Sequence, residues 1–371
     1  MKKFLIALIL VPFLFGAHGY PGAVFLMIWP SARPTSLGGA FSGIADDPSA
    51  TYYNPGGLGL LKEKLSVSLM HCNWLPGLTE GLDISMYYEF LALSYKTKDK
   101  GTFGFNTIYL NTGETEVWNE KGELLGKYTT FDVAFTFAYG YPILANLSCG
   151  LSWKFIYSFL VPDWVWKAMP ELGIERGGTG ITWAFDFGLL YKPFHWFSFG
   201  TSFANLGPPI SYIAGSEPDP LPRMLRLGMN FSPIKKEIFT LNLPLELNIG
   251  LVEKADTSTS ELEDMWKSFG MELNFVNNLF SLRLGYFEDV TGWRGGVIVE
   301  DENGEQDCIS LFEYLFNRKK RKLIRGDRKI AIPFTWGIGF AYKNFSLDIS
   351  SDELIYSFPT SNYKFSFNFR M

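Results

Sequence analysis

The chain has 371 residues, of which 47% are hydrophobic and 17% aromatic, with 34 Phe, 18 Tyr and 11 Trp. This aromatic content exceeds what an ordinary soluble domain needs to fill its core, so part of it must face something other than water. The formal net charge of -5 is spread along the chain and gives no reason to expect a nucleic-acid partner, and three distant cysteines without metal-ligand spacing predict neither a disulfide framework nor a zinc site.

Residues 1–19 have the pattern of a secretory signal peptide. A basic start is followed by an apolar run and by small residues just before Tyr20. Because neither Tyr20 nor a close neighbour is cysteine, the sequence predicts export without a lipid anchor. No later run reaches the roughly 18 apolar residues that a membrane-spanning helix needs, so a protein that enters a membrane would not do so as helices.

Residues 20–61 form a turn-rich segment ahead of the first predicted strand. Asp47 followed by Pro48 is a helix-start pair, and the sequence from Asn54 onward ends the helical turn. Such a compact segment fits inside a barrel as a hatch, and the alternative is a tail with ordinary turns. The residues assigned to this hatch motif are Asp46, Asp47, Pro48, Asn54, Pro55, Gly56 and Gly57.

Residues 146–159 show the period on which the fold prediction depends. Apolar residues at every second position, from Leu147 to Phe159, alternate with small, polar or charged ones. A strand places alternate side chains on opposite faces. The same pattern recurs at 131–141, 181–191, 241–251 and 363–371. These runs have about 10 residues, enough to cross a bilayer when tilted, whereas strands of soluble sandwiches typically have about 5 or 6.

This division predicts about 14 strands, an even number as bacterial barrels require. They lie near residues 64–71, 86–97, 101–110, 128–140, 146–159, 181–192, 195–205, 222–232, 239–252, 266–276, 279–288, 334–343, 344–351 and 361–370.

The connections between the predicted strands alternate in length. Short ones lie at 98–100, 141–145, 193–194, 277–278 and 343–344, and long ones at 72–85, 111–127, 160–180, 206–221, 253–265, 289–333 and 352–360. This alternation is typical of an outer-membrane barrel with short periplasmic turns and long extracellular loops. We therefore predict an all-β fold, a transmembrane antiparallel β-barrel over residues 62–371 with a long extracellular loop at 289–333, in preference to a secreted all-β domain.

The polar face of the predicted strands carries charges of both signs. Such charges suit paired networks in the lumen or contacts with the hatch, and a role in substrate binding is the alternative. The candidate lumen charges are Asp132, Lys154, Asp186, Glu246 and Arg283. Pro244 lies within a predicted strand, where it removes a ladder hydrogen bond and indicates a kink or bulge.

The segment 317–329 is strongly basic and falls on a predicted outer loop. There it would contact lipopolysaccharide phosphates or the acidic segment 300–307, or be solvated. The sequence contains no nucleophile elbow, zinc-protease motif or phosphate-binding glycine loop. We therefore expect no enzymatic activity, no cofactor and no metal site.

Several segments resemble a known family. They are "SARPTSLGGAFSGIADDPSATYYNPGGLG" at 31–59, "DFGLLY" at 186–191, "FANLGPPISYI" at 203–213 and "LPRMLRLGMNF" at 221–231. Together they are similar to the PorV/PorQ family of outer-membrane proteins, grouped with the FadL-like long-chain fatty-acid transporters. The resemblance implies a 14-stranded barrel plugged by an N-terminal segment with an Asn-Pro-Ala motif, which Asn54, Pro55 and Gly56 match in two positions. It also implies ligand release through a gap at a kinked strand, for which Pro244 is the candidate.

Two functions follow from this resemblance. The first is uptake of hydrophobic, fatty-acid-like small molecules across the outer membrane. The alternative is a PorV-type shuttle or attachment component of type IX protein secretion, with secretion-system proteins as partners. Both place the protein in the outer membrane in contact with its lipid.

Overall fold

The computed structural model describes residues 21–81, 84–98, 100–170, 173–174, 176–213, 215–236, 238–252, 265–289, 294–300, 306–316, 329–332, 334–352, 360 and 362–371. The predicted signal peptide at 1–19 and the basic segment 317–329, except Lys329, lie outside these residues.

Fourteen strands form one closed antiparallel barrel, so the predicted fold class is confirmed. Each strand pairs with its neighbours in chain order, and the first pairs with the last. The strands are β1 (Leu65–Asn73), β2 (Tyr87–Lys96), β3 (Thr102–Trp118), β4 (Leu124–Leu144), β5 (Leu147–Phe159), β6 (Thr179–Phe194), β7 (Phe197–Leu206), β8 (Met224–Lys235), β9 (Phe239–Gly250), β10 (Trp266–Phe275), β11 (Phe280–Asp289), β16 (Phe334–Tyr342), β17 (Phe345–Asp352) and β18 (Asn362–Arg370). We call the end with the short connections the turn end and the other the loop end.

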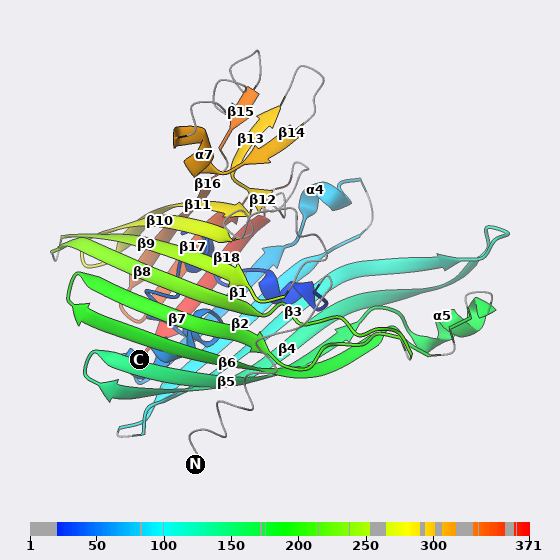
Figure 1. Cartoon of the computed structure of the whole chain (residues 1–371), viewed down its shortest axis with the longest axis horizontal. Helices are drawn as coiled ribbons and strands as arrows, with labels where there is room; N and C mark the ends of the chain where they lie inside the picture. Colours follow the sequence, from blue (N-terminus) through cyan, green and yellow to red (C-terminus); the bar gives the residue numbers. More distant parts are fainter. Residues whose placement is uncertain are drawn as a thin grey trace.

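The predicted long connection at 111–127 is wrong, because most of it is strand. β3 and β4 continue past the rest of the barrel as a paired ribbon that projects from the loop end (Figure 1). The ladder shifts register after Asn111 and then runs on from Glu114 to Val117. Outside hydrocarbon no face of the ribbon must be apolar, so the alternation that indicated the strands stops while the backbone pairing persists.

The long insertion between β11 and β16 carries its own small sheet. β12 (Arg294–Gly295) extends the edge of β11, and β13 (Val297–Glu300) pairs with both β14 (Gln306–Ile309) and β15 (Lys329–Ala331). Figure 1 shows this sheet and α7 (Leu311–Phe316) beyond the loop end of the barrel. The Glu288 carboxylate, at the end of β11, accepts hydrogen bonds from the Ser310 hydroxyl and the Leu311 amide, both at 2.8 Å. It therefore joins this insertion to the wall.

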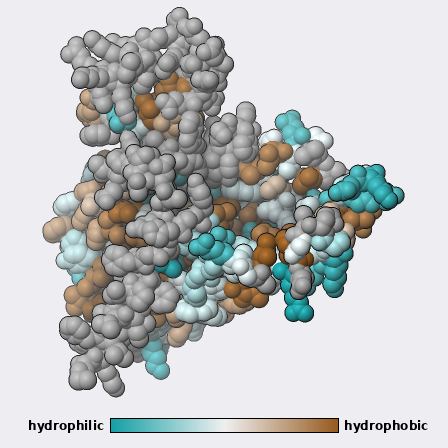
Figure 2. Space-filling model, turned by 45° about the vertical axis from the view of Figure 1, so that its right-hand side comes forward, coloured by the Kyte–Doolittle hydropathy of each residue, from teal (hydrophilic) through white to brown (hydrophobic). Residues whose placement is uncertain are grey.

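The barrel is apolar outside and polar inside. On β5, Leu151 and Trp153 are 43% and 39% exposed, while Ser152 and Lys154 between them are buried. Figure 2 shows hydrophobic residues spread over the visible wall, with hydrophilic residues mostly at its projecting ends. This arrangement inverts that of a soluble protein and matches a wall that faces lipid.

Residues 21–61 lie inside the barrel as the hatch, so the alternative of a simple tail is wrong. The hatch contains η1 (Val24–Met27), α2 (Ala32–Thr35), α3 (Ala50–Tyr53) and η2 (Pro55–Leu60). Two further short helices, α4 (Pro76–Thr79) and α5 (Asp163–Ala168), lie in loop-end connections. None of the helices among the described residues is long and apolar enough to cross a membrane.

The hatch motif makes contacts at both ends of α3, although the helix begins at Ala50, with Ser49 rather than Asp47 at the N-cap position. The Asp47 carboxylate accepts the Ser49 amide at 2.9 Å, just before α3. Asn54 is extended (φ -161°) and ends α3, and its side-chain oxygen accepts the Gly56 amide at 3.0 Å. The sequence did not predict η2, because we expected the glycines to release the chain, whereas they continue as a 3-10 helix.

A belt of inward-facing glycines in the strands makes room for the hatch. A Cβ at Gly200 would collide with the Ser42 carbonyl, and one at Gly188 with the Asn54 side chain. Several of these glycines are cross-strand partners, so they form a continuous shallow groove in the wall. The belt comprises Gly104, Gly140, Gly150, Gly188, Gly200, Gly228, Gly270, Gly285 and Gly337.

Gly200→Val should displace the hatch without preventing the barrel from closing, because the added side chain meets hatch backbone rather than a flexible side chain. We expect chymotrypsin to cleave the variant after Phe41 or Tyr53, while heat-modifiable migration on a gel still reports a folded barrel. Gly250→Val is the matched control, since a Cβ there has nothing within 4 Å. Full protection of the hatch in Gly200→Val would contradict the glycine-belt argument.

Candidate functional site: the hatch and the lumen wall

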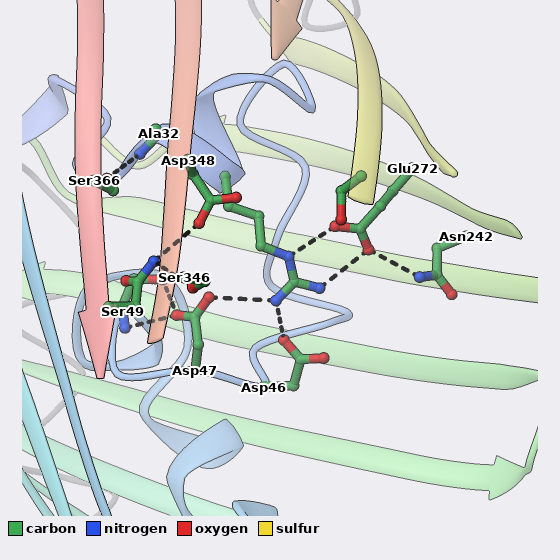
Figure 3. Close-up of polar contacts among 12 residues, drawn as sticks. Ala32, Asp46, Asp47, Ser49, Asn242, Glu272, Ser346, Asp348 and Ser366 are labelled. Atoms are coloured by element: carbon green, nitrogen blue, oxygen red, sulfur yellow. Dashed lines mark hydrogen bonds and ion pairs between the residues drawn. The ribbon is translucent and has the colours of Figure 1, made fainter. Parts of the chain in front are cut away.

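Arg33 of the hatch is the centre of a buried ionic network. Its guanidinium donates to Asp46 at 2.6 Å and to Asp47 at 3.4 Å within the hatch. It also donates to both carboxylate oxygens of Glu272 on β10, at 2.8 and 3.1 Å. Figure 3 shows Asp46, Asp47 and Glu272 converging on this group. The bidentate geometry fixes both the position and the orientation of the hatch.

The two hatch carboxylates respond differently to this guanidinium. Desolvation in the lumen would raise the pKa of Asp46, but the charge and hydrogen bond of Arg33 outweigh it and the pKa is lowered; the Asp46 side chain itself is 44% exposed. Burial raises the pKa of Asp47, which is farther from Arg33. Asp46 is therefore the firmer ionic partner of Arg33 within the hatch.

The network continues from Glu272 along the wall. Arg283 on β11 donates to Glu272 at 2.8 Å and to Asp348 on β17 at 2.7 Å. Arg283 and Arg33 thus share one carboxylate. Arg283, one of the predicted lumen charges, is thereby connected to Arg33 of the hatch through Glu272.

Glu246 and Arg226 hold the middle of the hatch by its backbone. The Glu246 carboxylate, on β9, accepts the amides of Phe41 and Ser42 at 2.9 and 2.7 Å. Arg226, on β8, donates to the Tyr52 carbonyl at 2.7 Å, and its guanidinium lies 4.7 Å from the Tyr52 ring centroid. The hatch has no strand partner in the lumen, so these side chains satisfy backbone groups that would otherwise be buried unpaired.

The remaining candidate charges bind within the wall. The Lys154 ammonium donates to Asp186 at 3.3 Å and to the side-chain oxygen of Asn205 at 2.5 Å. The backbone amide of Asn205 donates to Asp186 at 2.7 Å. Asp132 accepts from the Ser158 hydroxyl and lies apart from the others. The structure therefore brings Lys154 and Asp186 together, gives Glu246 and Arg283 to the hatch network, and leaves Asp132 separate.

Sequence reasoning missed Arg33 because Glu272, its partner in the wall, lies 239 positions away in the chain. The available signal was an arginine in an otherwise apolar segment that also contains the Asp46–Asp47 pair. A second missed contact is Lys364 of β18, which donates to Asp352 at 2.7 Å and to the Trp29 carbonyl at 2.9 Å.

The hatch is bonded unevenly around the barrel. On β2, the Tyr88 hydroxyl donates to the Ile28 carbonyl and Lys96 to the Leu61 carbonyl. Between these two contacts the wall of β1 to β4 presents buried side chains with polar atoms that have no partner among the described residues. These are Ser68, Ser94, Thr102, Asn106 and Thr136.

On the side of β1 to β4 the loop half of the lumen is apolar, whereas the rest of that half carries the buried charges of Lys154, Asp186, Arg226 and Lys364. Along the inner face of β3, Asn106 is followed by Ile108 and Leu110, and β1 changes in the same way from serines to Met70. These side chains form one buried cluster with Phe25, Trp29 and Tyr52 of the hatch. Trp29 packs edge to face against Phe287, with ring centroids 4.7 Å apart. Among the described residues, this packing fills the lumen beside β1 to β4.

The turn half opens into a polar cavity of about 380 Å³, which we call the vestibule. Its walls are the link from Leu60 to Glu63 and the turn ends of β6 to β10, with Arg33 and Asp46 at its inner limit. Among the described residues no group of three or more His, Cys, Asp or Glu side chains could hold a metal ion.

The fold and site define a closed 14-stranded barrel plugged by an N-terminal hatch. No family model and no curated protein matches the chain. Among solved structures, it is similar to the toluene transporter TodX of Pseudomonas putida, with 12% identity, a TM-score of 0.51, and coverage of 92% of this chain and 98% of that one.

Two other solved structures cover similar shares of both chains at lower TM-scores. The toluene transporter TbuX of Ralstonia pickettii is 13% identical with a TM-score of 0.48, over 92% of this chain and 98% of that one. A FadL homologue of Pseudomonas aeruginosa is 11% identical with a TM-score of 0.45, over 92% and 99%. At such an identity the likeness to TodX shows a shared fold and nothing more.

Arg33→Ala should loosen the hatch while leaving the barrel closed. Removing one partner from a buried ionic network leaves charge uncompensated and typically costs about 3 to 5 kcal/mol. We therefore expect the hatch amides of Phe41 and Ser42 to exchange with solvent hydrogen far faster than in the parent protein. Lys127→Ala is the control, because Lys127 pairs only with Glu114 and Glu116 on the exposed β3–β4 ribbon. Unchanged exchange in Arg33→Ala would remove the ionic network as the hatch anchor.

Proposed function

We propose that the protein is an outer-membrane channel for hydrophobic small molecules, opened by movement of the hatch. The observation that carries this proposal is the apolar surface that β1 to β4 present in the loop half of the lumen, where Phe90, Ile108 and Leu110 of the wall contact hatch aromatics. A pore for hydrophilic solutes would have a polar, water-filled interior. The apolar outer wall supports the membrane location, and the fold shared with TodX supports transport rather than catalysis.

Because the lumen is closed, a ligand passes only if side chains of the hatch move. Trp29 and Tyr52 occupy the space that a hydrophobic ligand would need. Each methylene that such a ligand moves from water into an apolar site contributes about 0.8 kcal/mol. A ligand with several methylenes thus gains enough to offset the separation of a few hatch contacts.

Ile108→Gln should slow uptake of a hydrophobic probe, because it places an amide in the apolar half of the lumen. An amide buried without a partner costs roughly 1 to 3 kcal/mol, so we expect uptake to fall by about tenfold. The assay is uptake of radiolabelled toluene and dodecanoate by a bacterial host that lacks its own hydrophobic-compound channel. Ile108→Met, similar in volume and still apolar, should retain uptake. Equal uptake by the two folded variants would argue against this route.

A lateral opening between β9 and β10, at Pro244, is part of the proposal. The two strands pair at Leu245 and at Asn242, but the two positions between them, Leu243 and Pro244, have no ladder partner on β10. Pro244 lacks an amide hydrogen, and it faces inward against Gly270. The wall therefore has an interrupted ladder of hydrogen bonds at this point.

Pro244→Thr should restore a ladder donor and slow lateral delivery. We expect slower transfer of a fluorescent fatty acid into the bilayer of proteoliposomes. Leu243→Val, which adds no donor at the neighbouring position, is the control. If transfer persists at the parent rate in Pro244→Thr, the gap is an ordinary bulge and the ligand leaves elsewhere.

A second candidate function is that of a PorV-type interaction protein. The projecting β3–β4 ribbon favours it, since Trp118 and Leu124 are 49% and 45% exposed near its tip. Exposed apolar residues on such a projection are typical of contact surfaces for proteins. Mass spectrometry of the detergent-extracted protein separates the two functions, since a channel would retain an acyl compound and an interaction protein a protein partner.

A further inference from the structure

The vestibule carries cationic residues that the hatch network does not use. Lys62, Lys192, Lys235 and Arg370 line it, and none of the four forms an ion pair with another described residue. Arg33, which also lines it, is already paired with carboxylates. The carboxylates among the lining residues are Asp46 and Glu63, so five cationic side chains stand against two anionic ones and the cavity has an excess of positive charge.

This excess is unlike the charge pattern elsewhere in the lumen. Lys154, Arg283 and Lys364 each have a carboxylate partner within 3.3 Å. Like charges gathered around one cavity repel each other, and an anion in the cavity would relieve the repulsion. The cationic side chains of the vestibule are therefore arranged like a binding site for an anion, unlike the paired charges elsewhere in the lumen.

An apolar strip lies beside the cations. It consists of Ile44, Leu60 and Leu61 from the hatch side and Phe194 and Phe197 from the turn between β6 and β7. Phe194 is 56% exposed. Cationic and apolar surfaces of this kind, side by side in one cavity, match a molecule with an anionic head and a hydrocarbon tail.

A buried polar atom adds to the site. Asn230 is 9% exposed and lines the vestibule, and its side-chain oxygen has no hydrogen-bond partner. This oxygen is itself buried, so a hydroxyl group or a water molecule held by a bound head group reaches it only after a small side-chain movement. The unmet acceptor is an observation independent of the cationic residues.

We infer that the vestibule binds the anionic head group, carboxylate or phosphate, of an amphipathic molecule whose tail lies on the apolar strip. The inference rests on the proposed function only where that molecule is the transported one, and what it adds is the position of a binding site at the turn end of the barrel. The same chemistry would accept the head group of a lipid from the adjacent leaflet. Lys192 and Lys235 supply charge-assisted hydrogen bonds to the head group.

The test compares probes of equal tail length in nanodiscs of phosphatidylcholine, with empty nanodiscs as the baseline. Dodecanoate, lauroyl-lysophosphatidylglycerol and dodecanol are titrated onto the full chain and onto the double variant Lys192→Gln, Lys235→Gln. We expect the variant to bind the anionic probes about tenfold more weakly, because each lost charge-assisted hydrogen bond weakens binding, and to bind dodecanol as before. Lys121→Gln, in the exposed turn of the β3–β4 ribbon, is the control and should leave all three affinities unchanged.

Each outcome decides the inference. A loss for dodecanoate identifies a free acid as the ligand, and a loss for the lysolipid alone identifies a leaflet head group; either supports the site. Unchanged affinities, or an equal loss for dodecanol, would overturn it, as would the same loss in Lys121→Gln. Equilibrium binding does not require passage, so a protein that binds dodecanoate here but fails in cellular uptake would disprove the channel function and not the vestibule site.

Discussion

The constraint on which the structure depends is that a backbone amide or carbonyl cannot remain unpaired in hydrocarbon, where each such group costs several kcal/mol. Fourteen strands meet this constraint only because β1 pairs with β18 and leaves no free edge. Closure creates an interior, and the interior must be filled or wetted. The hatch, the buried charges and the glycine belt are all consequences of filling it with the chain's own N-terminal residues.

Filling the lumen raises the same problem a second time, since the hatch brings backbone groups of its own. They cannot join the wall ladder, whose donors and acceptors are already used. Side chains replace strands as partners, with Glu246 accepting two amides and Arg226 and Lys364 donating to carbonyls. The charges of both signs on the inner face are thus required by the hatch, and most of them are engaged before any ligand is considered.

Much of the fold could be predicted because lipid imposes a period on the sequence. The strict alternation of residues 147–159 exists since one face of β5 meets hydrocarbon. The β3–β4 ribbon was missed because its residues lie outside the lipid-facing part of the wall, where the alternation ends. The helix η2 was missed because its glycines, which allow close approach to the wall, were interpreted as ending the helical structure. The contacts of Arg33 could not be predicted from one sequence, because they depend on how residues 239 positions apart meet across the lumen.

The contacts of the hatch differ from one side of the barrel to the other, and this difference bears on how it moves. Toward β8 to β11 and β16 to β18 it is held by ionic and backbone hydrogen bonds. Against β1 to β4 the described residues give it two hydrogen bonds, from the Tyr88 hydroxyl to the Ile28 carbonyl and from Lys96 to the Leu61 carbonyl. Buried polar atoms without a described partner occur on both sides of the barrel, at Asn106 and Thr136 and also at Asn248 and Ser268. Separation along β1 to β4 would therefore break fewer hydrogen bonds than separation along the rest of the wall.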